Sequence, residues 1–173
     1  RQRQMCIRDR ANVLETSRFW REIAQQLAPQ YPEVELDFMF VDNAAMQIIR
    51  QPTHFDVIVT ENMFGDILTD EASVISGSLG MLPSASVGSE VALFEPIHGS
   101  YPQAAGKNIA NPMAAILSAA MLLEHLGLTA EGSAVRDAVN RALTEGIVTE
   151  DLAAQGERRY STSEVGDFIA AHI

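Results

Sequence analysis

Segments in which apolar residues recur at helical spacing alternate with segments that have the pattern of β-strands, and this alternation limits the possible folds more than any other feature. Strand patterns occur at residues 34–40, 55–60 and 91–94. Helical patterns occur at residues 13–27, 42–50, 64–76, 113–127 and 135–146, and Ser161 with Glu164 predicts a capping box for a further helix. Such alternation is typical of the α/β class.

The segments between these patterns carry cap and loop signals. Asp42 is expected to cap the helix at 42–50, and Asn111 with Pro112 the helix that follows. Gly77, Gly80 and the residues up to 90 are expected to form a Gly/Ser-rich loop. Three strands are few for so many helices, and their apolar faces and edges need partners that these residues do not supply. The sequence therefore predicts part of a larger protein.

The first ten residues differ from the rest of the chain. They hold four of the twelve lysines and arginines and the single cysteine. Neither helical nor strand periodicity is visible in them. We interpret residues 1–10 as a non-native junction, and a genuine basic tail is the alternative.

Composition excludes several functional classes. A net charge of −11 argues against nucleic-acid binding, which needs a clustered basic face. No apolar run approaches the roughly 20 residues of a membrane span, and no signal peptide is visible. One cysteine allows no internal disulfide and fits a reducing, cytoplasmic location. So few basic residues are unusual for an enzyme of anionic substrates, unless the arginines lie elsewhere.

Two acidic residues form the first candidate site. Asp66 and Asp70 are four residues apart in an expected helix, so their Cβ atoms lie about 5–6 Å apart on one face. Their repulsion is relieved by a cation, and carboxylate oxygens suit Mg²⁺ or Mn²⁺. Asp42 is a third candidate oxygen ligand. A solvated helix face is the alternative interpretation.

The second candidate is the glycine-punctuated loop at residues 95–112, between an expected strand and an expected helix. α/β proteins place ligands at such positions, and a helix N-terminus favours an anion. The loop lacks the G-x-G-x-x-G pattern, so a purely structural loop remains the alternative.

Together these residues resemble the isocitrate and isopropylmalate dehydrogenase family. The resemblance runs from Ala11 to the C-terminus, and the order and separation of the matching segments agree with the family. The matching segments are residues 11–15, 62–68, 77–85 and 98–112.

The resemblance implies the incomplete fold of that family and an NAD-linked oxidative decarboxylation of a 2-hydroxy diacid that uses Mg²⁺ or Mn²⁺. Asp66 and Asp70 would be metal ligands together with Asp42, which would reach the site of the partner subunit. Asn12, Val13 and Asp42 would bind the substrate, and an apolar Val13 suits an isopropyl group better than a third carboxylate. The adenosine half of NAD would be held by His98, Gly99, Ser100, Gln103, Ala104, Gly106, Lys107, Asn108 and Asn111.

Three departures from the family pattern matter. Arg10 stands where the family has a catalytic lysine, so no catalytic residue is assigned. Gln103 replaces the aspartate usual in NAD-dependent members. The family's N-terminal half, with its catalytic tyrosine and substrate-binding arginines, is absent, so these residues alone are expected to be inactive.

The resemblance also implies the domain organisation. Residues 11–76 would belong to a subunit-interface domain, whose helices within 42–76 join those of a second copy in a homodimer. Residues 77–173 would belong to the cofactor-binding domain. An enzyme of isopropylmalate is the interpretation that Val13 favours. Tartrate, homoisocitrate and isocitrate dehydrogenases remain open alternatives to it, as does a non-catalytic fragment that only dimerises.

Overall fold

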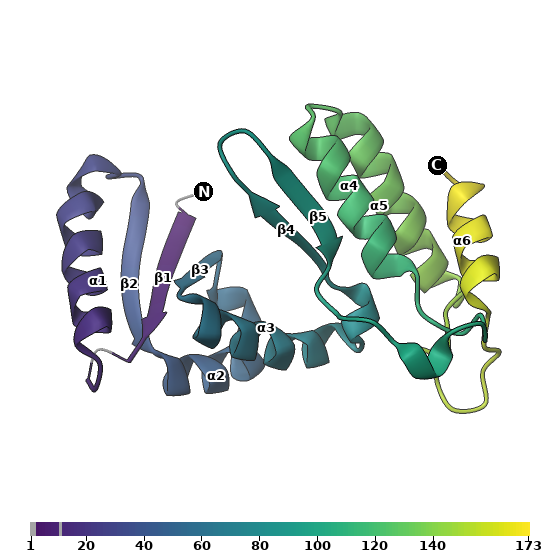
Figure 1. Cartoon of the computed structure of the whole chain (residues 1–173), viewed down its shortest axis with the longest axis horizontal. Helices are drawn as coiled ribbons and strands as arrows, with labels where there is room; N and C mark the ends of the chain where they lie inside the picture. Colours follow the sequence, from purple (N-terminus) through teal and green to yellow (C-terminus); the bar gives the residue numbers. More distant parts are fainter. Residues whose placement is uncertain (1–2, 11) are drawn as a thin grey trace. The chain divides into compact units, whose positions relative to one another are not determined.

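The structure is a computed structural model that describes residues 3–10 and 12–173. The chain divides into two compact units, the first ending at Ile75 and the second spanning Ser76–Ile173 (Figure 1). No helix within the described residues is long and apolar enough to span a membrane. Assignment of the two units to an interface domain and a cofactor domain stays a prediction.

The first unit is built on a three-stranded parallel sheet with the order β2-β1-β3. Its core is formed by Ala44, Ile48 and Leu68, where helices α2 and α3 face each other. The elements are β1 (Arg3–Asp9), α1 (Glu15–Leu27), β2 (Val34–Phe40), α2 (Val41–Arg50), β3 (Val57–Thr60) and α3 (Asn62–Ser76), with short 3₁₀ helices at Ala28–Gln30 and Pro52–His54.

Residues Arg3–Asp9 form strand β1, although no strand pattern is visible in the sequence of residues 1–10. Its backbone pairs with β2 on one side and β3 on the other, and such pairing is available to any sequence that lies between two strands. Asp9 at its end is fully buried and accepts two hydrogen bonds from Arg21, at 2.6 and 2.9 Å. A non-native origin of these residues is a separate prediction, which the secondary structure does not test.

The second unit consists of an antiparallel hairpin and three helices. Helix α4 lies beside the hairpin and beside α5, and α6 packs on α5 (Figure 1). Its core contains Met113, Ala138, Val139, Ala142, Val148, Val165 and Ile169. The elements are β4 (Pro83–Val87), β5 (Ala92–Pro96), α4 (Met113–His125), α5 (Thr129–Thr144) and α6 (Thr162–Ala170), with 3₁₀ helices at Leu79–Met81 and Pro102–Ala104.

In the second unit, a feature that depends on local sequence was predicted correctly, whereas a strand that depends on long-range pairing was missed. The capping box of Ser161 and Glu164 is confirmed. Residues 83–87 were expected in a loop but form β4, because they pair with β5 from Pro83↔Pro96 to Val87↔Ala92. Asn111 accepts the backbone N–H of Met113 at 3.0 Å, although Pro112 is the cap residue itself.

The expected cap at Asp42 was wrong. Helix α2 begins one residue earlier, with Phe40 as its N-cap, so Asp42 lies in the first turn. There the carboxylate accepts the backbone N–H of Asn43 at 2.9 Å. An acidic side chain in the first turn still favours the helix through its dipole.

Helices α4 and α5 approach so closely at Gly132 that no other side chain fits. A Cβ atom on Gly132 would lie 3.0 Å from the Ala120 carbonyl oxygen and 2.6 Å from Cγ of Glu124. Glu124 cannot easily move away, because Arg136 donates two hydrogen bonds to its carboxylate, at 2.7 and 2.9 Å. The same contact lowers the pKa of Glu124.

We therefore expect Gly132→Ala to lower the free energy of unfolding by about 1–3 kcal/mol, as overpacking does, despite the better helix propensity of alanine. Gly166→Ala in α6 is the control, since a Cβ there would meet no atom within 4 Å. In that control, the free energy of unfolding should rise by up to about 1 kcal/mol. Urea denaturation measures both, and equal stability of the two variants would contradict the packing argument.

Candidate functional site

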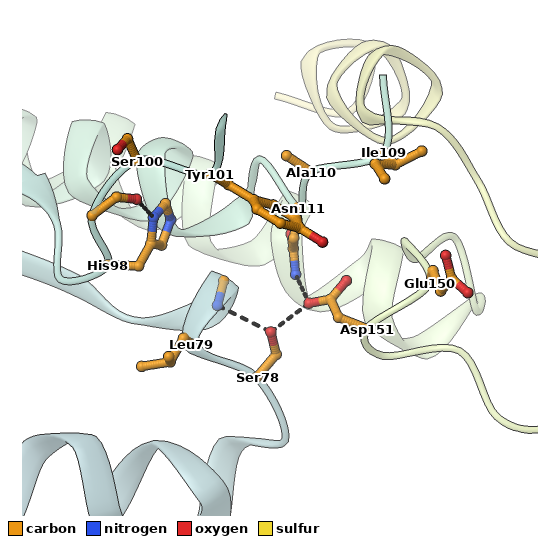
Figure 2. A pocket seen from close by; sticks show the side chains of 12 residues that line it. Ser78, Leu79, His98, Ser100, Tyr101, Ile109, Ala110, Asn111, Glu150 and Asp151 are labelled. Atoms are coloured by element: carbon orange, nitrogen blue, oxygen red, sulfur yellow. Dashed lines mark hydrogen bonds between the residues drawn. The ribbon is translucent and has the colours of Figure 1, made fainter. Parts of the chain in front are cut away.

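The glycine-punctuated loop forms one wall of a pocket of about 520 Å³ within the second unit. The other walls come from the start of the 3₁₀ helix at Leu79–Met81 and from the segment before α6 (Figure 2). The lining residues are Ser78, Leu79, Gly80, His98, Gly99, Ser100, Tyr101, Ile109, Ala110, Asn111, Glu150 and Asp151.

A network centred on Asp151 joins these walls. Its Oδ2 accepts hydrogen bonds from the Ser78 hydroxyl and, at 3.0 Å, from the Asn111 amide (Figure 2). The Thr149 hydroxyl donates to Oδ1. Ser78 in turn accepts the backbone N–H of Gly80 at 3.0 Å.

The same network sets the protonation of Asp151. Burial raises the pKa of this carboxyl, but the hydrogen bonds from Ser78, Thr149 and Asn111 outweigh burial and hold the pKa below its ordinary value of 3.8. Because the folded-state pKa is the lower one, the carboxylate contributes stability that is complete above pH 3.8 and is lost as the pH falls through the folded pKa. The network is therefore intact at neutral pH.

Gly80 permits the close approach of two walls. A Cβ atom at this position would lie 2.7 Å from Cβ of Asn111, so only glycine fits. In the sequence Gly80 indicated only a loop, whereas in the structure its lack of a side chain lets Asn111 reach Asp151.

The predicted cofactor residues divide into two groups. His98, Gly99, Ser100 and Asn111 line the pocket. The others lie outside that lining, and Lys107 and Asn108 border a separate polar groove of about 380 Å³ with Glu150 and Arg159. The residues outside the pocket lining are Gln103, Ala104, Gly106, Lys107 and Asn108.

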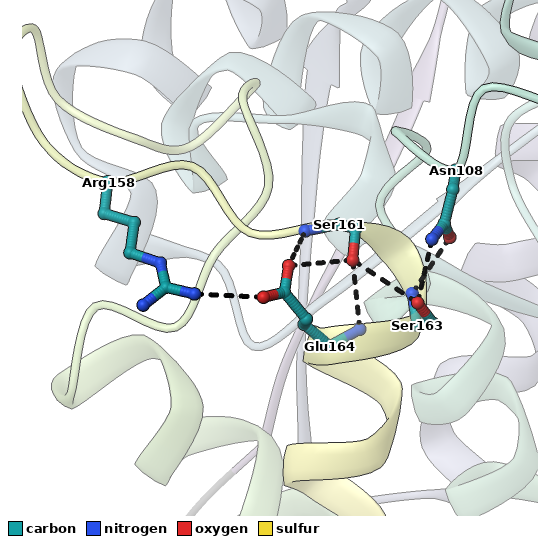
Figure 3. A network of polar contacts seen from close by, with 5 residues as sticks. All are labelled: Asn108, Arg158, Ser161, Ser163 and Glu164. Atoms are coloured by element: carbon teal, nitrogen blue, oxygen red, sulfur yellow. Dashed lines mark hydrogen bonds and ion pairs between the residues drawn. The ribbon is translucent and has the colours of Figure 1, made fainter.

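Asn108 anchors the loop to helix α6. Its amide donates to the Ser163 hydroxyl at 2.8 Å, and its Oδ1 accepts the Ser163 backbone N–H at 3.1 Å (Figure 3). The backbone at Asn108 has a φ of 55°, a conformation that asparagine tolerates better than most residues. In this structure, Asn108 thus holds the loop in place.

The first turn of α6, to which Asn108 binds, is held by further hydrogen bonds and by an ion pair. Glu164 accepts the backbone N–H of Ser161 at 2.8 Å, which with the Ser161 hydroxyl lowers its pKa, and Arg158 pairs with its other oxygen at 3.0 Å (Figure 3). The anchor point of Asn108 is therefore an ordered helix end.

Sequence reasoning missed one wall of the pocket. Glu150 and Asp151 were not singled out, because they lie in no matching segment and far from the loop in sequence, and Ser78 was included only as part of the matching segment 77–85. The only available signal was a pair of adjacent acids after the apolar Ile147-Val148, in a stretch without helical spacing.

The candidate metal and substrate residues lie in the first unit. Asp66 and Asp70 are both exposed on α3, and the Asn62 amide donates to Asp66 at 2.9 Å. Asp42 pairs with Arg10 at 2.8 Å. Within residues 3–10 and 12–173, no three histidine, cysteine or acidic side chains gather closely enough to hold a metal ion.

The turn before α1 carries the other predicted substrate residues. Asn12 and Val13 are exposed, the latter at 62%. The Val13 backbone N–H donates to the Arg10 carbonyl at 2.8 Å, which closes the turn. Both side chains are accessible to a small molecule.

Known proteins resemble this chain over nearly its whole length. A 3-isopropylmalate dehydrogenase of Bacteroides fragilis is 57% identical over 173 residues, which is 100% of this chain and 49% of the relative. The enzyme of the same name from Geobacillus kaustophilus is 60% identical over 175 residues, which is 100% of this chain and 47% of the relative. The chain thus spans about half the length of these relatives.

A solved structure shares the fold. The isocitrate dehydrogenase from Methylococcus capsulatus superposes with a TM-score of 0.93 at 38% identity, covering 98% of this chain and 50% of that one. A family model described as isocitrate/isopropylmalate dehydrogenase matches residues 1–169. The incomplete α/β fold expected from the sequence is confirmed, and the chain belongs to the isocitrate/isopropylmalate dehydrogenase family.

Proposed function

We propose that this chain is the C-terminal part of an enzyme that oxidises and decarboxylates 3-isopropylmalate with NAD and Mg²⁺ or Mn²⁺, a step of leucine biosynthesis. The observation that carries the proposal is the 57% identity to the Bacteroides fragilis 3-isopropylmalate dehydrogenase along the whole chain. The solved isocitrate dehydrogenase is less similar, at 38% identity. Isopropylmalate is therefore the substrate that the comparisons favour.

The pocket of the second unit fits the adenosine half of the cofactor. Its volume of about 520 Å³ lies in the range of small-molecule sites, and its lining combines apolar groups with polar side chains. His98 and Asn111 come from the loop predicted to bind NAD. We propose that the other predicted residues of this loop, between Gln103 and Asn108, lie at the rim of the pocket or anchor the loop.

The pair of Asp66 and Asp70 fits a hard divalent cation. Their carboxylates are exposed and one helical turn apart on α3, and oxygen ligands of this kind suit Mg²⁺ or Mn²⁺. When bound, the metal would polarise the substrate's 2-hydroxyl and carboxylate while NAD accepts a hydride. Two protein ligands are few, so we assign the third to Asp42 of the partner subunit.

Arg10 cannot serve as the base of this reaction. A guanidinium stays protonated in proteins, and Arg10 is occupied by its ion pair with Asp42. The lysine of the family at this position could lose a proton when desolvated. A functional protein therefore needs a different residue at position 10.

The exposed faces of α2 and α3 support a homodimer. Six large apolar side chains on these helices are at least half exposed, which is costly in water and typical of a surface that a partner covers. A second copy is the partner we assign, because it would also supply Asp42. The six residues are Met46, Ile49, Met63, Ile67, Val74 and Ile75.

A hybrid enzyme tests the activity. In it, the N-terminal half of the Bacteroides fragilis relative, including the residue equivalent to Arg10, precedes residues 11–173 of this chain. It should produce NADH from isopropylmalate, NAD and Mn²⁺ and should turn isocitrate over far more slowly. The 173 residues alone should give no NADH above a blank. An inactive but folded hybrid, or a preference for isocitrate, would overturn the substrate assignment.

Subunit mixing tests the metal site. In the hybrid, Asp66→Asn and Asp42→Asn should each abolish activity at low Mn²⁺. Mixed dimers of the two variants contain one intact site, so random mixing should restore about a quarter of the activity of the unsubstituted hybrid. Asp167→Asn, an exposed acid on α6, is the control and should change nothing. If each variant keeps normal Mn²⁺ dependence, Asp66 and Asp42 are only solvated side chains.

The pocket also predicts a preference for NAD over NADP. Its lining contains no lysine or arginine. Of its two acids, Glu150 is already paired with Arg159, while Asp151 is in no ion pair of the described residues, so a 2′-phosphate would meet a carboxylate and no cation of the lining. Comparing kcat/KM for the two cofactors in the hybrid measures this preference. Equal values, or higher values for NADP, would show that the acidic lining does not govern selectivity.

A further inference from the structure

The two oxygens of Asp151 have different surroundings. Oδ2 binds Ser78 and Asn111, which are 73 and 40 residues away in sequence and belong to two different walls of the pocket. Oδ1 binds Thr149, which is fully buried and is not among the lining residues. The carboxylate therefore connects the pocket surface to a fixed point in the protein interior.

Thr149 is held firmly. Its carbonyl oxygen accepts the backbone N–H groups of Leu152 and Ala153, both at 3.1 Å. The neighbouring Val148 is 5% exposed and belongs to the core cluster with Val165 and Ile169. Displacing the Thr149 hydroxyl would thus disturb the core.

Asp151 is bonded by neutral donors. None of the ion pairs among the described residues includes Asp151, so its negative charge is stabilised by hydrogen bonds from Ser78, Thr149 and Asn111. Hydrogen bonds to an ionised group are stronger and shorter than those between neutral groups. The carboxylate can therefore hold the segments of Ser78 and Asn111 against the segment of Asp151, although these segments share no helix or strand.

We infer that Asp151 is a positioning residue: fixed from behind by Thr149, it holds Ser78 and Asn111 at the spacing that opens the pocket to the adenosine half of a dinucleotide. This inference rests on the proposed cofactor site. Thr149 acts only through Asp151, because its side chain does not reach the pocket surface.

The test uses substitutions at Thr149 in the hybrid enzyme. Thr149→Val removes the hydroxyl with little change of volume, and Thr149→Ser restores it. Ser118→Ala is the matched control, since Ser118 is 3% exposed and donates within α4 to the Ala114 carbonyl. Each variant is measured for its KM for NAD, its kcat, its melting temperature and the hydrogen exchange of the Gly80 amide.

Thr149→Val should raise the KM for NAD roughly tenfold, the value of one hydrogen bond to a charged group, with kcat nearly unchanged. Exchange at Gly80 should accelerate, because its N–H donates to Ser78. Thr149→Ser should recover both properties. Ser118→Ala should leave the KM for NAD and the Gly80 exchange unchanged.

The outcomes separate the inference from the proposed function. If Thr149→Val lowers the melting temperature but leaves the KM for NAD and the Gly80 exchange unchanged, Asp151 is merely structural and the inference is overturned. If the unsubstituted hybrid folds but shows no saturation with NAD, the proposed cofactor site fails and the inference fails with it.

Discussion

The burial of helix α4 on two sides is the constraint on which the second unit depends. The helix packs against the hairpin of β4 and β5 on one side and against α5 on the other. Met113, Ala114 and Ala120 are fully buried, and apolar residues occupy most of its surface, as expected of a helix covered on two faces. Since the glycine-punctuated loop enters this helix through Asn111, the position of the loop follows from that packing.

The loop is then fixed by side chains at two points. Asn111 reaches Asp151, and Asn108 reaches the first turn of α6. Between these anchors, Ile109 and Ala110 line the pocket. The short segment between these anchors is bonded at both ends, so it loses less conformational freedom on binding a ligand than a free segment would, and less of the interaction energy is lost to ordering. Order in the loop therefore favours binding.

The parts of the fold that depend on local sequence could be predicted, and those that depend on distant pairing could not. The capping box of Ser161 and Glu164 needs only four residues, and it was found. Strand β4 exists because β5 lies next to it, and its own residues, Pro-Ser-Ala-Ser-Val, carry no clear strand signal. Strand β1 was missed for the same reason. Pairing between strands is a property of two segments, and a pattern within one of them does not reveal it.

The candidate site shows the same division. The loop was recognised from its glycines and its place before a helix, and four of its predicted residues line the pocket. Asp151 was missed, because its role depends on Ser78 and Asn111, which are distant in sequence. Asn108 was correctly placed in the loop, but its side chain is bonded to Ser163 at 2.8 Å. A sequence motif locates such a loop without showing which polar residues face a ligand and which hold the loop.

The exposed acidic pair in the first unit presents a different physical situation. Like charges one helical turn apart destabilise a helix by a few tenths of a kcal/mol. Asp66 is relieved only in part, because the Asn62 amide that bonds it is neutral. Exposed apolar side chains such as Ile67 and Val74 lie on the same helix. Both features are unfavourable in an isolated chain, and a cation and a second subunit would relieve them together. This is why we propose that the acidic pair of the metal site and part of the dimer interface share helix α3.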